Sequence, residues 1–207
     1  MCKNCGIIVS DLAIIVKAMS IGQIGKIAGS IFIVLFILLI GLFVHEFGHG
    51  LTAVALGGEI TYLEVMPGLQ LYPELAKIEW DYVIGRINYS GIDPGWEYGL
   101  SLLMGSMTTF VISCVALVLL LLIRPDGFWR LILFTFSLFS LDFISYTIFP
   151  SLGWRHWIFV GGSKAEPVVA VELMGVSKYY VIIGAIIILL VFTVAWVRHF
   201  LDLKKYA

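Results

Sequence analysis

A metal-binding motif lies inside a long apolar stretch of the chain. His45, Glu46 and His49 form the pattern H-E-x-x-H within IFIVLFILLIGLFVHEFGHGLTAVAL. On an α-helix, residues i and i+4 share one face, so both imidazoles can reach one metal ion while the glutamate stands beside it. Zinc lowers the pKa of a bound water, and a nearby glutamate can take the proton and pass it to a leaving amine. The spacing therefore predicts metal-assisted hydrolysis with Glu46 as the general base.

A third protein ligand is expected, because catalytic zinc sites usually have three protein ligands and one open position. Asp142 is the only acidic residue in the apolar stretch FSLFSLDFISYTIF. His45 and Asp142 each lie fourteen residues beyond the start of their apolar segments, near Ile31 and Phe128. That spacing is roughly 21 Å along a helix in both cases, so the two side chains should lie at one depth. We expect His45, His49 and Asp142 to bind the metal.

Other interpretations of these polar residues stay open. A lone buried histidine is often a satisfied core residue, but three ionisable groups within five residues of a span are costly and typical of a functional site. Asp142 could instead bond to neighbouring helices. Among rival ligands, Glu59 lies in a loop and His199 lies in the last turn of the final span. His156 is kept as a group beside the ligands or the substrate, with an interfacial histidine as the alternative.

The overall composition is that of a membrane protein. The 207 residues are 60% hydrophobic and 13% charged, with a mean hydropathy of +1.02. Soluble globular domains are about half apolar and about a quarter charged. The formal net charge of −1 provides no basic field that would bind nucleic acid. These values exclude a soluble globular domain and a disordered chain, and they predict a multi-pass protein whose surroundings are the lipid bilayer.

The hydropathy pattern predicts an all-α polytopic membrane protein. Apolar segments long enough to span a bilayer lie at about residues 27–57, 97–123, 128–149 and 179–197. Residues 7–26 carry Asp11, Lys17 and Lys26, which would be costly within a span, so we expect an N-terminal interfacial helix there. Pro67-Gly68 predicts a small membrane-associated β-hairpin within residues 59–90.

These segments are expected to form one membrane-embedded domain, residues 1–207. The interfacial segment takes residues 1–26, the three-helix catalytic core takes 27–150, and a loop with the fourth helix takes 151–207. Residues 166–176 predict a short surface helix to which no chemistry is assigned. Eight lysines and arginines lie on the side that holds the termini and five lie on the other side, which favours cytoplasmic termini.

The stretch HEFGHGLTAVALGGEI, followed by a short β segment and a distal intramembrane aspartate, resembles the site-2 protease family of intramembrane zinc metalloproteases. The similarity covers about residues 30–150. It implies that His45, His49 and Asp142 bind zinc and that Glu46 is the catalytic base. Asp142 stands in SLDFI rather than in the Asn-Pro…Asp-Gly setting common in the family. With GLSLLMGSMTTF as only a loose match to the family's middle helix, the chain resembles a divergent, minimal member.

The sequence therefore predicts an endopeptidase with one zinc per chain that cleaves membrane-spanning or membrane-proximal protein substrates. A transmembrane substrate must unwind first, and a strand edge of the hairpin at residues 59–73 could hold it; packing of the hairpin on the interface is the alternative. A catalytically inactive relative that binds membrane segments is a second hypothesis. A transporter or ion-conducting protein is less favoured, because the sequence shows no internal repeat. No sequence signal specifies an oligomeric state.

Overall fold

The computed structural model describes residues 21–66, 68–79, 85–156 and 162–204 of the chain. Most of the interfacial helix predicted for residues 7–26 lies outside these ranges, and residues 21–26 belong to the first long helix instead. The chain divides into two units, residues 1–36 and residues 37–207. Every contact discussed below lies within the second unit.

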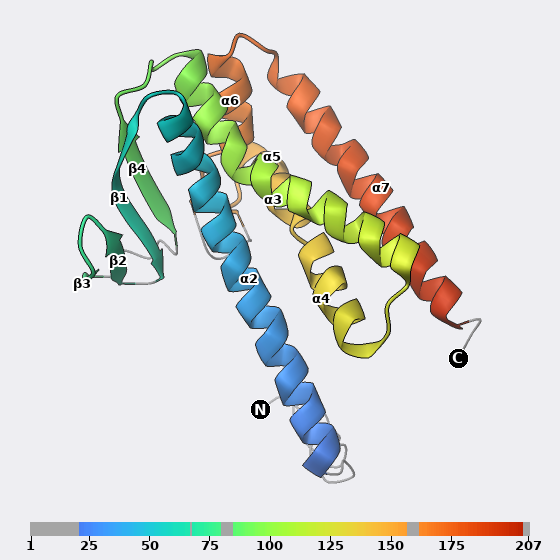
Figure 1. Ribbon diagram of the computed structural model, residues 1–207. Helices are drawn as coiled ribbons and strands as arrows, with labels where there is room; N and C mark the ends of the chain where they lie inside the picture. Colours follow the sequence, from blue (N-terminus) through green and yellow to red (C-terminus); the bar gives the residue numbers. More distant parts are fainter. Residues whose placement is uncertain (1–20, 67, 80–84, 157–161, 205–207) are drawn as a thin grey trace, which may run out of the picture. The chain divides into compact units, whose positions relative to one another are not determined.

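Four helical segments in the described ranges are long and apolar enough to cross a membrane (Figure 1). They are α2 (Ile21–Ala55), α3 (Trp96–Ile123), the pair α4 (Gly127–Ser137) and α5 (Ser140–Ser151), and α7 (Lys178–Lys204). Together with one small sheet, they confirm the predicted fold class. The spans begin and end close to the predicted residues, because apolar length decides both.

The third span is two helices rather than the single helix that hydropathy predicts. Helix α4 ends at Ser137 and α5 begins at Ser140. Around the break, backbone N–H groups donate to carbonyls three residues earlier, from Leu141 to Leu138 and from Asp142 to Phe139. The Ser137 and Ser140 hydroxyls also donate to nearby backbone carbonyls. The break places Asp142 in the first turn of α5.

The predicted hairpin is confirmed, and it is part of a four-stranded antiparallel sheet. The strands are β1 (Glu59–Met66), β2 (Leu69–Tyr72), β3 (Ala76–Lys77) and β4 (Arg86–Ser90), in the order β3-β2-β1-β4. Gly68, at φ +72°, makes the turn between β1 and β2. The second half of β1, from Leu63, pairs with β2 on one side and β4 on the other, whereas its first residues, from Glu59 to Tyr62, pair with β4 alone. The outer strands of the sheet are β3 and β4.

Helix α6 (Glu166–Leu173) is not the surface helix that the sequence suggests. Its Val168 and Val171 join Phe143 of α5 and Val181 of α7 in one buried apolar cluster. The helix packs beside α3 (Figure 1). The apolar residues of this short helix therefore face the protein interior, and its first residue, Glu166, is carried inward with them.

Candidate metal centre

The two motif histidines lie one turn apart on α2 and are almost completely enclosed. His45 is 2% exposed and His49 is 5% exposed. Their Nε2 atoms are 3.1 Å apart. The helical spacing thus brings both ring nitrogens to one point, as the sequence predicts.

The opposite nitrogen of each imidazole faces a hydrogen-bond acceptor. His45 Nδ1 lies 2.7 Å from Asp142 Oδ2, and His49 Nδ1 lies 2.8 Å from the carbonyl oxygen of Ser101. Since a carbonyl and an ionised carboxylate can only accept, each Nδ1 carries the hydrogen. In the neutral imidazoles both Nε2 atoms therefore present lone pairs to each other, an arrangement that a cation between them would stabilise.

Two glycines, Gly48 on α2 and Gly105 on α3, allow α3 to pack closely against α2 at His49. A β-carbon on Gly48 would collide with the backbone carbonyl of Met104, and one on Gly105 would collide with the His49 ring. The same contact is fastened by Ser101, whose hydroxyl donates to the His49 carbonyl oxygen at 2.8 Å. Small residues at this helix contact therefore hold the His49 ring in one orientation.

Glu166 completes a group of three metal-binding side chains. Its Oε2 lies 3.5 Å from His45 Nε2 and 3.4 Å from His49 Nε2. That oxygen is buried, and none of the described residues makes a hydrogen bond to it. The ligand atoms all lie within 4.8 Å of one another, so His45, His49 and Glu166 could hold a metal ion.

Asp142 stands beside this group rather than in it. Its Oδ2 accepts hydrogen bonds from His45 Nδ1 and from Thr109 Oγ1, each at 2.7 Å. The predicted nearness of Asp142 to His45 is therefore present, but the contact is with the nitrogen that faces away from His49 and Glu166. The ligand role of Asp142 stays a prediction, and this geometry favours a different role, in which the carboxylate orients His45.

Glu46 lies next to the sheet. It is 6% exposed, and a β-carbon on Gly85 would lie 2.7 Å from Glu46 Oε1. Gly85 immediately precedes β4, so the start of the edge strand touches the predicted base. Among the described residues, none is recorded in a hydrogen bond with the Glu46 carboxylate.

Sequence reasoning missed Glu166 as a site residue. Its signal was present, since an acidic residue follows the glycine-containing segment GGSKA and begins a short helix with proline as its second residue. Nothing local, however, indicates that this helix turns inward. The rival ligands Glu59 and His199 do not join the group around His45 among the residues described.

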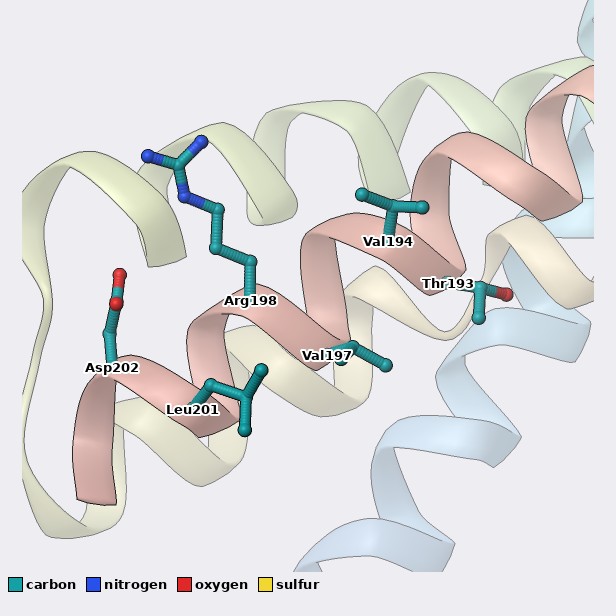
Figure 2. Close-up of a pocket in the computed structure, with 6 residues that line it drawn as sticks. All are labelled: Thr193, Val194, Val197, Arg198, Leu201 and Asp202. Atoms are coloured by element: carbon teal, nitrogen blue, oxygen red, sulfur yellow. The ribbon is translucent and has the colours of Figure 1, made fainter. Parts of the chain in front are cut away.

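A separate hollow runs along α7 and is lined by residues of that helix (Figure 2): Thr193, Val194, Val197, Arg198, Leu201 and Asp202. Arg198 and Asp202 project to the same side of the helix. None of the metal-binding side chains lines this hollow, and we assign it no chemistry.

Comparison of the chain with family models, with curated proteins and with solved structures found no match.

Proposed function

We propose that the protein is a zinc endopeptidase that hydrolyses peptide bonds within or beside the membrane. The observation that carries this proposal is the meeting of the two imidazole Nε2 atoms and a buried carboxylate oxygen at one point. A cation between these three atoms would be bound by all of them. Two histidines and a glutamate are a ligand set found in zinc peptidases.

His45, His49 and Glu166 would hold the zinc in this proposal. Zinc, when bound, supplies a Lewis acid that activates water and polarises a carbonyl group. The chain holds its own ligands in place, because Asp142 fixes the His45 ring and the Ser101 carbonyl fixes the His49 ring. Acceptors of this kind on the outer nitrogens of ligand histidines set their tautomer and raise their basicity.

Glu46 is the general base of the proposed reaction. It follows His45 directly in the motif, so its carboxylate lies near the same site. In the proposed reaction it takes a proton from the attacking water and delivers that proton to the leaving amine. Glu46 is buried, and electrostatic interactions are stronger at a buried site than in water.

The proposed substrate is an extended segment of a membrane protein, held along the outer edge of the sheet at β4. A peptide carbonyl inside a helix is shielded, so the substrate must unwind before attack. Strand pairing would satisfy the backbone groups that unwinding frees. The start of β4 touches Glu46 through Gly85, so a substrate strand on this edge would lead to the base. The predicted alternative, an edge of the hairpin at residues 59–73, stays a prediction, since the first residues of β1 pair with β4 alone.

The resemblance of residues 30–150 to the site-2 protease family supports the same proposal, as does the presence of four helices that could span a bilayer. In this proposal the chain is a divergent member that uses Glu166 where the family uses an aspartate, and Asp142 has become an orienting group. Cytoplasmic termini remain part of the proposal.

Cleavage of a model transmembrane substrate by purified protein in lipid vesicles tests this function. Wild type should cleave, and Glu46→Gln should keep its zinc but lose the activity by several orders of magnitude, because the amide is nearly isosteric and cannot accept the proton. Glu59→Gln, on the exposed end of β1, is the matched control and should cleave normally. Activity in Glu46→Gln equal to that of wild type would refute the proposal.

A further inference from the structure

The last ligand of the proposed centre stands at the very start of a helix. Glu166 is the first residue of α6, and the residue before it, Ala165, makes no side-chain capping hydrogen bond. No strand or helix of the described chain connects α5 to this point. The packing of α6 brings Glu166 inward, and a contact just before the helix would further fix where the Glu166 carboxylate lies.

His156 makes the contacts that could do this. It is 3% exposed, although it lies in the connection between two helices. Its backbone N–H donates to the Gly162 carbonyl at 3.0 Å, and its Nε2 lies 2.8 Å from the Lys164 carbonyl oxygen. A carbonyl can only accept, so Nε2 carries the hydrogen. The second contact fixes the backbone two residues before Glu166.

The His156 imidazole is also connected to His45, a second proposed ligand, through a stack of three aromatic rings. His156 stacks on Tyr146, with ring centroids 3.8 Å apart and planes 29° apart. Tyr146 in turn lies over His45, with ring centroids 4.6 Å apart. Tyr146 stands one turn after Asp142 on α5, so one helix face supports the His45 ring from two directions.

Only a side chain with both a ring and a donor makes these two contacts. Phenylalanine would stack on Tyr146 but could not donate to Lys164, and glutamine could donate but would not stack. Gly162 leaves room for the ring, since a β-carbon there would lie 3.3 Å from His156 Cε1. The other ring nitrogen, Nδ1, is buried and has no hydrogen-bond partner among the described residues.

We propose that His156 is a positioning residue that couples the Glu166 carboxylate to the His45 ring through Tyr146 and the Lys164 carbonyl. This inference rests on the proposed metal centre. It predicts that metal affinity depends on His156 even though His156 is not a ligand, and that this dependence passes through Glu166.

The test uses the full chain in detergent and Co²⁺ as the probe, read by chelator competition and by the visible absorption band of the bound ion. His156→Ala should weaken Co²⁺ binding by about tenfold to 100-fold and alter the band. His156→Phe and His156→Gln each keep one contact and should fall between wild type and His156→Ala. His199→Phe, another buried histidine, is the control and should match wild type.

A double-mutant cycle separates positioning from general destabilisation. In a Glu166→Gln background, His156→Ala should cause a much smaller loss of Co²⁺ affinity than in wild type, because the carboxylate that it positions is already gone and only the support of His45 through Tyr146 remains. Additive losses, or wild-type affinity in His156→Ala, would overturn the inference. If His156→Ala does not fold, the cycle is run with His156→Phe and judged by the same outcomes.

The same measurements distinguish a failure of the proposed His156 role from a failure of the proposed metal centre. Co²⁺ binding that is lost in His49→Ala and Glu166→Gln but unchanged in His156→Ala would leave the metal centre standing and remove only the role of His156. Wild type that binds no Co²⁺, or His49→Ala that binds it as well as wild type, would overturn both.

Discussion

Replacing Gly85 with alanine should slow peptide hydrolysis without removing the metal. A β-carbon at this position would lie 2.7 Å from Glu46 Oε1 and 2.9 Å from Leu42 Cδ1. Ordinary contact begins at 3.4 Å, so the carboxylate or the strand must give way by 0.7 Å (3.4 − 2.7). Misplacing a catalytic group by about 1 Å can cost about 10²-fold in rate, so we expect kcat to fall by roughly tenfold to 10²-fold.

The assay measures kcat and KM on a transmembrane substrate in lipid vesicles, together with the zinc content of the same samples. Zinc should be unchanged, because the nearest neighbours of the added methyl group belong to Glu46 and Leu42, neither of which is a proposed ligand. Gly184→Ala on α7 is the matched control, since a β-carbon there would meet nothing within 4 Å. A Gly85→Ala enzyme with wild-type kcat and full zinc would refute the placement of the base beside β4.

Three further predictions concern the metal and the substrate. Asp142→Asn should bind zinc with full stoichiometry but about 10-fold to 100-fold more weakly in chelator competition, because the charge-assisted bond to His45 is lost; unchanged affinity would contradict the orienting role. Zinc at about 100 times its Kd should stabilise wild type by about 2.7 kcal/mol, seen as a rise in Tm, and a similar rise in His49→Ala would argue against the site. Methylating substrate backbone nitrogens should slow cleavage at alternate positions only, since successive residues of a paired strand point their N–H groups to opposite sides; equal effects at every position would exclude pairing with β4.

Local patterns were sufficient to predict the spans and the histidine pair. The apolar lengths of α3 and α7 require helices that fit a bilayer, and the i, i+4 spacing of His45 and His49 requires a shared face. The turn at Gly68 is equally local, so the hairpin could be predicted. Pairing of β4 with β1 joins segments more than twenty residues apart, and no local signal specifies it.

The third ligand could not be predicted from the same patterns. Counting residues along two spans gives the depth of Asp142, and the carboxylate does lie beside His45. Depth does not reveal which ring nitrogen it contacts, and that choice separates a ligand from an orienting group. Glu166 enters the site through the tertiary packing of α6, which hydrophobic periodicity does not encode.

The central claim is that His45, His49 and Glu166 hold one zinc ion. Elemental analysis of purified protein, dialysed against a weak competing chelator, tests it most directly. Wild type and the control Glu172→Gln, from the same helix as Glu166, should each retain one zinc per chain. His49→Ala and Glu166→Gln should retain much less. Full zinc in Glu166→Gln, with loss in Asp142→Asn, would contradict the claim and make Asp142 the third ligand.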